Sequence, residues 1–330
     1  MQGRWAHWTD VMRQDLSWQR LFAGDITEES LKFRINAQCL TLPTDDNKRR
    51  WRMLPVDVRC QLRWPDPLPD GAPAGVTAGS ICGHRNPALH HVLNSCVVAL
   101  HQQRYTYRHD SILQVVVSAI RRHLDGINNG TTSLGRRRSV NFVREGGSKY
   151  SINRQLPEPA PTLLSDHLAR ATDWTLLADL PGQSYDVFPP EIALTGLRPN
   201  IVVKSDSTKF AVIYELTSPW TDRAMVSNDL KRPKYEPLID EAAGNGWTLV
   251  VQPFEVSSLG LISNSTWSII RDLQLPSKQR SGLKRQLENV AMRTSYVIFL
   301  SRHSATWASR PLLDCSPSLR QIPDDRQQLA

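Results

Sequence analysis

The alternation of apolar and polar positions is clearest between residues 164 and 310. Segments with helical spacing alternate there with short runs rich in Val, Ile and aromatic residues, which favour strands. The expected helices are Leu164–Ala171, a helix from about Asp222, Thr266–Leu273 and Gly282–Met292, and the expected strands are Trp174–Leu180, Ile201–Val203, Phe210–Leu216 and Thr248–Val256. This order predicts an α/β fold in which a mixed sheet of about four strands is flanked by helices.

The rest of the chain divides by pattern into shorter segments. Residues 1–59 have helical spacing, and the cluster Asp45–Asn47 is predicted to cap a helix at Lys48–Met53. Residues 60–124 follow, with helical spacing over residues 87–124, and residues 125–163 are predicted to be a linker with one short strand near Val140–Val143. Residues 63–81 are rich in Pro, Gly and Ala without periodicity, which predicts a mobile loop, and residues 311–330 form a tail.

Composition narrows the possible partners. The 330 residues carry 40 Lys and Arg against 32 Asp and Glu, a formal net charge of +8 that favours nucleic acid over a membrane surface. The longest apolar runs are too short to span a bilayer, so no membrane partner is expected. The first residues, MQGRWAHW, lack the apolar stretch of a secretory signal, so the five cysteines favour a metal site over a disulfide framework.

Three potential metal ligands lie close together in the segment CGHRNPALHHVLNSC: Cys82, His91 and Cys96. A closed tetrahedral zinc site needs a fourth ligand. Removing residues 63–81 would join Cys60 directly to Cys82 as Cys-x-x-Cys-Gly, so the loop resembles an insertion between two ligands. Such a loop costs only about 2–4 kcal/mol in closure entropy, against roughly 10–16 kcal/mol from a structural zinc site. The spacing therefore predicts a Cys₃His zinc site, with His91 preferred over His90; the alternative is a set of buried thiols beside a capping histidine.

A basic and aromatic strip follows these cysteines. The segment RYTYRHD interleaves cations with aromatic rings and can contact phosphates and stack on unpaired bases. The strip comprises Arg104, Tyr105, Tyr107, Arg108 and His109. The alternative is an ordinary amphipathic turn with solvated arginines, and the sequence alone does not decide between the two.

The most informative segment runs from Leu197 to Tyr235, LRPNIVVKSDSTKFAVIYELTSPWTDRAMVSNDLKRPKY. It resembles the core of a restriction-enzyme-like nuclease domain, in which one strand begins with a carboxylate, the next ends with another, and a lysine lies nearby. Phosphodiester hydrolysis uses such carboxylates to hold a divalent metal and the lysine to stabilise developing charge. In this chain the first carboxylate position holds Asn200. The alternative is that Glu215 is an ordinary strand-end acid and that Lys231 and Lys234 belong to a solvated helix face.

Taken in order, these segments resemble the C-terminal region of polyproteins from non-LTR retrotransposons that carry a restriction-like endonuclease. The resemblance rests on SLKFRINAQCLTLPTDDNKRRW, the cysteine-histidine knuckle, RYTYRHD, FVREG, LRPNIV and YELTSP with KRPKY. In that family a reverse transcriptase is followed by a zinc knuckle and then the nuclease. No Tyr-x-Asp-Asp motif occurs here, so the resemblance is to a fragment or to a gene derived from one.

The resemblance implies specific roles for residues of the nuclease segment. The family's Arg-Pro-Asp falls on Arg198, Pro199 and Asn200, its Glu-Leu-Thr begins at Glu215, and its helix lysines fall on Lys231 and Lys234. In an intact relative the two acids would hold Mg²⁺, and a lysine would stabilise the transition state. It further implies a structural zinc, DNA and RNA as partners and a location in the nucleus; it leaves the oligomeric state open.

Three departures from the family pattern predict impaired catalysis. Asn200 cannot supply the negative charge that a hard cation favours. Pro233 is expected to disrupt the helix that carries the lysines. The family's Pro-x-Glu-Val-Gly appears as Pro253 to Ser257, without the glycine. Two functions follow: a nucleic-acid-binding module that has lost catalysis, or an active Mg²⁺-dependent DNA-nicking endonuclease.

Overall fold

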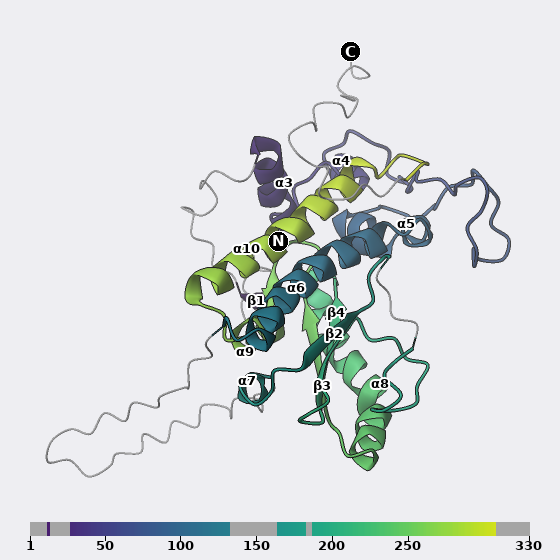
Figure 1. The fold of residues 1–330 in the computed structure, drawn as a ribbon. Helices are drawn as coiled ribbons and strands as arrows, with labels where there is room; N and C mark the ends of the chain where they lie inside the picture. The colour runs from purple at the N-terminus through teal and green to yellow at the C-terminus, as the bar shows by residue number, and fades with distance from the viewer. Residues whose placement is uncertain (1–11, 14–26, 133–163, 183–186, 308–330) are drawn as a thin grey trace, which may run out of the picture. The chain divides into compact units, whose positions relative to one another are not determined.

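The computed structural model describes residues 12–13, 27–132, 164–182 and 187–307 (Figure 1). The chain forms two compact units, each discontinuous in sequence. One contains Met1–Leu31 and Ile112–Met292, and the other contains Lys32–Ser111 and Arg293–Ala330. The predicted strand near Val140–Val143 and the tail 311–330 lie outside the described residues.

The first unit contains a four-stranded mixed sheet with strand order β2-β3-β4-β5. The strands are β2 (Trp174–Ala178), β3 (Ile201–Ser205), β4 (Phe210–Thr217) and β5 (Thr248–Glu255). β2, β3 and β4 are antiparallel neighbours, whereas β5 runs parallel to β4. The parallel pair requires a crossover, which helix α8 (Ala224–Gly244) provides. All four strands expected from the sequence are present, and the α/β class is confirmed.

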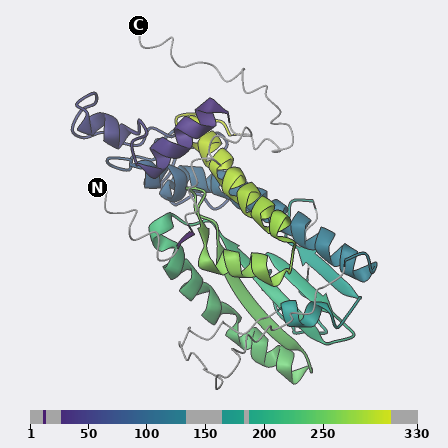
Figure 2. The ribbon, with the colours of Figure 1, turned by 90° about the vertical axis from the view of Figure 1, so that its left-hand side faces the viewer.

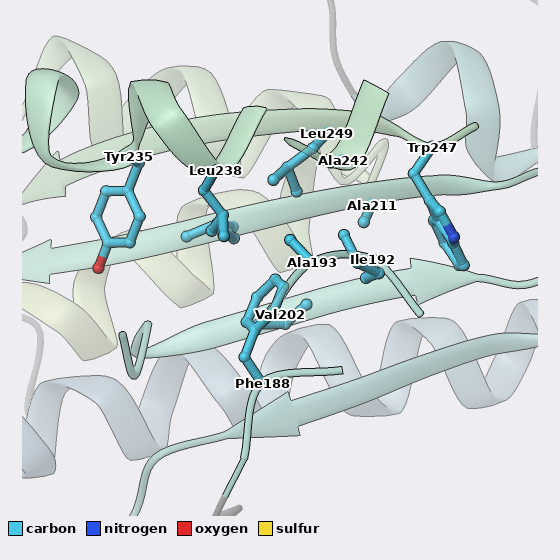
Figure 3. Close-up of a cluster of buried hydrophobic side chains, with 11 residues drawn as sticks. Phe188, Ile192, Ala193, Val202, Ala211, Tyr235, Leu238, Ala242, Trp247 and Leu249 are labelled. Atoms are coloured by element: carbon cyan, nitrogen blue, oxygen red, sulfur yellow. The ribbon is translucent and has the colours of Figure 1, made fainter. Parts of the chain in front are cut away.

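Helix α8 covers one face of this sheet (Figures 1 and 2). Its Tyr235, Leu238 and Ala242, spaced at helical intervals, are buried against strand residues such as Ile213 and Leu249. Figure 3 shows Tyr235 and Leu238 pointing from the helix toward the strands. This packing explains why the predicted disruption at Pro233 does not occur: Pro233 is exposed, and the buried face of the helix holds α8 together through it.

The other helices of this unit follow the predicted order, with shifted ends. They are α7 (Ser165–Leu168), the short 3₁₀ turn η2 (Thr221–Arg223) before α8, and α9 (Asn264–Asp272), whose N-cap is Ser263. β1 (Met12–Arg13) pairs with β6 (Ile262–Ser263), so the expectation of helix throughout residues 1–59 is wrong at this point. The pairing partner lies about 250 positions later, and local spacing carries no information on it.

Two long helices have residues in both units: α6 (Arg104–Asn128) and α10 (Ser277–Leu300). In the first unit α6 buries an apolar stripe that includes Ile112, Val116 and Ile120. The linker was expected to begin at residue 125, but α6 continues to Asn128. The helix extends this far because the Asn128 side chain makes hydrogen bonds with both the N–H and the carbonyl of Trp174. No helix among the described residues is long and apolar enough to cross a membrane.

The second unit begins within α3 (Glu28–Gln38) and continues through α4 (Asp45–Arg50), the π-helical turn η1 (His91–Ser95) and α5 (Val97–His101). Thr44, not the acidic cluster, caps α4, and its hydroxyl accepts a hydrogen bond from the N–H of Asn47. The helix therefore begins three residues earlier than predicted, with the two aspartates in its first turn. Residues 87–124, where helical spacing was found, contain two breaks, at Cys96, which is extended, and at Gln103, which has a φ of 60°.

Candidate metal centre and sheet-edge site

Cys60 and Cys82 lie on the two facing strands of a hairpin, at its base, where Cys60 pairs with His84 and Cys82 pairs with Leu62. The N–H of Gly83 donates to the carbonyl of Cys60 at 3.1 Å, and the N–H of Cys82 donates to the carbonyl of Leu62 at 2.8 Å. Gly83 has a φ of 71°, a left-handed conformation that glycine adopts without a steric penalty. The sequence indicated that residues 63–81 resemble an insertion between two ligands. This arrangement is consistent with that interpretation, because the segment begins shortly after Cys60 and ends directly before Cys82.

The segment between these cysteines is not the loose loop that the sequence predicted. Arg63 and Ile81 form an antiparallel bridge, and the N–H of Trp64 donates to the carbonyl of Ser80 at 2.9 Å. Trp64 is only 3% exposed and packs in the same apolar cluster as Cys60 and Cys96. The burial of one large aromatic ring anchors the segment where composition alone indicated mobility.

His91 and Cys96 are brought together by the π-helical turn η1. A π-helix has hydrogen bonds from i to i+5, a wider turn than the α-helix, and such turns are frequent at functional sites. His91 begins the turn and Cys96 directly follows it, with an extended backbone at φ −75° and ψ 118°. Both side chains are buried, at 2% exposure each, and face the hairpin cysteines.

The structure brings all four predicted ligands together. The potential ligand atoms of Cys60, Cys82, His91 and Cys96 lie within 4.8 Å of one another, and Nε2 of His91 is 3.7 Å from Sγ of Cys82. Two ligand atoms that each lie about 2.0–2.3 Å from one tetrahedral ion are separated from each other by nearly the distance found between Nε2 of His91 and Sγ of Cys82. Nδ1 of His91 is buried without a hydrogen-bond partner among the described residues. The cluster could therefore hold a metal ion, and its soft sulfur and imidazole donors are compatible with zinc.

Hydrogen bonds and burial shift the pKa values of three groups in this cluster. Hydrogen bonds from Cys60 and Cys96 hold the pKa of the Cys82 thiol well below its usual value, while the same pairing with Cys82 raises the pKa of Cys60. Burial opposes protonation of His91, but hydrogen bonds to Cys82 and Cys96 outweigh it and raise its pKa to about 9. A bound metal must displace these protons, so its affinity falls as the pH is lowered.

Two members of the basic and aromatic strip, Tyr105 and Arg108, make hydrogen bonds with the backbone that carries His91 and Cys96. The Tyr105 hydroxyl accepts a hydrogen bond from the N–H of Cys96 at 3.0 Å and donates to the carbonyl of Val92 at 3.1 Å. The Arg108 guanidinium donates to the carbonyl of Leu93 at 2.9 Å. These bonds fix the backbone of the turn that presents His91 and Cys96.

The structure corrects the prediction that Arg104 and Arg108 contact nucleic acid. Their exposed fractions are 0% and 1%. Arg104 donates through Nη1 to the carbonyl of Ser301 at 2.5 Å and through Nη2 to that of Ser304 at 2.6 Å. Burial lowers the pKa of each to about 10, so both remain cations at neutral pH. Both guanidinium groups therefore donate to backbone carbonyls of the same unit and are not available at its surface.

The other two members of the strip are half-buried. The ring of Tyr107 lies edge-on to Trp307, with centroids 5.5 Å apart. Nδ1 of His109 is 3.0 Å from the neighbouring carboxylate of Asp110. The strip as a whole is thus a packed helix start, and its buried arginines fit neither the exposed binding surface nor the amphipathic turn with solvated arginines.

The second predicted site lies where β3 begins and β4 ends. The N–H of Asn200 donates to Oε2 of Glu215 at 3.1 Å, and Oδ1 of Asn200 accepts from the N–H of Leu216 at 2.8 Å. Glu215 is 3% exposed. Its other oxygen, Oε1, accepts from Nζ of Lys231 at 2.6 Å. The two strand ends and α8 therefore bring three of the predicted residues into contact.

Lys234 does not join this group. Its Nζ lies 4.9 Å from the centroid of the Tyr235 ring and 3.4 Å from the Tyr235 hydroxyl. One helical turn separates Lys231 from Lys234, but only Lys231 lies at the position that faces Glu215. Among the residues that the structure describes, Glu215 does not belong to any group of three or more acids, histidines or cysteines close enough to share an ion.

One acid next to this site was missed by the sequence analysis. Asp179 follows β2, and its N–H donates to the carbonyl of Asn200 at 2.9 Å. Its Oδ1 accepts from Nη2 of Arg198 at 2.7 Å. Asp179, Asn200 and Glu215 thus occupy facing positions on three adjacent strands, where side chains share one face of a sheet. The available signal was an acid ending a strand, as Glu215 does.

No family model matches this chain, and no curated protein matches it as a relative.

Proposed function

We propose that this protein is a retrotransposon-derived nucleic-acid-binding protein with a restriction-like endonuclease fold that Asn200 has impaired. The observation that carries the proposal is the contact of Asn200, Glu215 and Lys231 at one edge of the mixed sheet. The order of α7, three antiparallel strands, α8 and a parallel strand agrees with the order that the resemblance implies. The proposal includes DNA and RNA as partners and a location in the nucleus.

In this proposal the four-residue cluster is a structural zinc knuckle. Cys60, Cys82, His91 and Cys96 would hold the ion, which would link the hairpin to the π-helical turn. Structural zinc sites contribute directly to folding energy, and an apolar cluster surrounds the cysteines of this unit. The metal would therefore stabilise the unit that carries it.

Impairment follows from the chemistry of the sheet edge. Mg²⁺ at this edge would supply a Lewis acid and an activated water to a DNA phosphate. Glu215 offers one buried carboxylate, but its Oε1 already accepts from Lys231. Asn200 offers a neutral oxygen that is engaged with the Leu216 N–H. A site with one charge where two are needed binds Mg²⁺ weakly.

The test is a nicking assay on supercoiled plasmid with Mg²⁺ or Mn²⁺, together with DNA and RNA binding at several salt concentrations. We expect binding that weakens steeply as salt is added and negligible nicking by the unaltered protein. Absence of binding at low salt would refute the nucleic-acid-binding function.

A second candidate function is an active DNA-nicking endonuclease, and Asp179 is the observation that favours it. Asp179 lies one strand beyond Asn200, and it accepts from Arg198, which falls on the arginine of the family's Arg-Pro-Asp. In this alternative Asp179 supplies the second carboxylate. Robust nicking by the unaltered protein that is abolished by both Asp179→Asn and Glu215→Gln would establish it.

A further inference from the structure

The cations of the predicted strip are buried, so a nucleic acid must be recognised elsewhere. A different basic and aromatic segment is exposed at the end of α4. Trp51 is 49% exposed and Met53 is 66% exposed, which is unusual for large apolar side chains. They alternate with Arg50 and Arg52, both exposed, and follow the half-buried Lys48. We call these five residues the Trp51 surface.

The cations of this surface are partly prearranged. Asp46, which is 4% exposed, accepts from Arg49 at 2.8 Å through one oxygen and from Arg50 at 2.9 Å through the other. A guanidinium has five N–H donors, so an arginine held by one carboxylate oxygen can still contact a phosphate. The side chain of Arg52 makes no ion pair or hydrogen bond with the described residues. The segment keeps a net positive charge around an exposed indole.

The backbone at Arg52 adds a second observation. α4 ends with the N–H of Arg52 donating to the carbonyl of Arg49 at 2.9 Å and that of Met53 donating to the carbonyl of Lys48 at 2.8 Å. This closure places Arg52 at a φ of 62°, where glycine is the usual residue. A β-carbon in this region is unfavourable by roughly 1–2 kcal/mol. Leu40, Gln103 and Gln274 follow helix ends in the same conformation, so the role of the Arg52 charge is inferred from its exposure beside Trp51.

We propose that the Trp51 surface binds single-stranded nucleic acid, with the Trp51 indole stacked on an unpaired base and Lys48, Arg50 and Arg52 on the flanking phosphates. The chain's net charge of +8 favours a polyanion, and an exposed indole between cations fits a ligand that alternates flat bases with phosphates. The inference rests on the proposed nucleic-acid-binding function and assigns its contact surface.

The test measures binding of the full chain to a fluorescent oligothymidylate by anisotropy at low salt. Trp51→Ala is expected to weaken binding roughly 5- to 150-fold, the range for loss of one base–aromatic stack. Trp51→Phe should retain most of the affinity. The matched control is Val56→Ala, which truncates a neighbouring apolar side chain that is 84% exposed and lies outside the surface.

Arg52→Gly separates binding from folding. Relief of the left-handed strain should leave the melting temperature equal or higher, while the affinity for oligothymidylate falls several-fold; Arg52→Lys should restore much of it. A purely structural role predicts no loss of affinity. The slope of log K against log salt should decrease by about 0.7 for each phosphate contact removed.

Each outcome decides between the two proposals. If the unaltered chain binds no nucleic acid, both this inference and the proposed function are overturned. If it binds but Trp51→Ala and Arg52→Gly bind like the unaltered chain, only the Trp51 surface is overturned. Displacement of the oligonucleotide by polyglutamate at equal charge would also overturn it, because an acidic protein partner needs no stacked base.

Discussion

Asn200→Asp is the most informative single change in this protein. It replaces an amide by a carboxylate of the same shape, and one oxygen can still accept from the Leu216 N–H. The new charge faces Glu215 on the adjacent strand, where opposed side chains are about 5 Å apart. Two like charges at that separation repel by about 3 kcal/mol at an effective dielectric constant of about 20.

The ion pair between Lys231 and Glu215 offsets part of this repulsion. We therefore expect Asn200→Asp to lower the free energy of unfolding by about 1–3 kcal/mol in the absence of divalent metal. Mg²⁺ or Mn²⁺ should restore that loss, because a cation between two carboxylates converts repulsion into ligation. The unaltered protein should respond much less to the same metals, and only the variant should nick supercoiled plasmid.

Urea unfolding with and without Mn²⁺ measures this difference, alongside the nicking assay. Asn200→Ala is the control, since it removes the bond to Leu216 without adding charge and should be destabilised independently of metal. Adding Glu215→Gln to Asn200→Asp should remove both the repulsion and the metal response. An Asn200→Asp variant whose stability is indifferent to Mn²⁺ and that does not nick would refute the two-carboxylate reasoning.

Three further predictions follow from the described contacts. Cys60→Ser should lower zinc content and stability, whereas Cys39→Ser, an exposed thiol outside the cluster, should change neither; zinc release titrated with a chromogenic chelator measures this. Arg104→Met should lower the free energy of unfolding by about 2–4 kcal/mol, because the carbonyls of Ser301 and Ser304 lose their donors, and it should leave the affinity of the folded protein for oligothymidylate unchanged. Burial raises the pKa of Asp173, but hydrogen bonds from Ser205 and Ser207 outweigh it and lower that pKa to about 2. Its contribution to stability is therefore complete above its unfolded pKa and lost as the pH falls toward about 2, and Asp173→Asn should flatten this part of the urea-midpoint profile.

The sequence by itself determined the elements of the sheet and the four residues that could hold a metal ion. β3 and β4 are nearly continuous apolar runs because β3 is buried at four of its five positions and β4 at seven of its eight. The four residues could be read from spacing, because the segment between Cys60 and Cys82 leaves and returns through paired strands that keep the two cysteines close.

Only the tertiary structure decided which charged residues contact one another and which are buried. Arg104 and Arg108 look like surface cations in sequence, but Arg104 donates to the carbonyl of Ser301, 197 positions away. Local patterns cannot show this, because an arginine buries its charge only where distant carbonyls meet it. The same reason explains why Lys231 rather than Lys234 contacts Glu215, and why Asp179 lies beside Asn200: strand register and helix rotation are set by packing across the whole sheet.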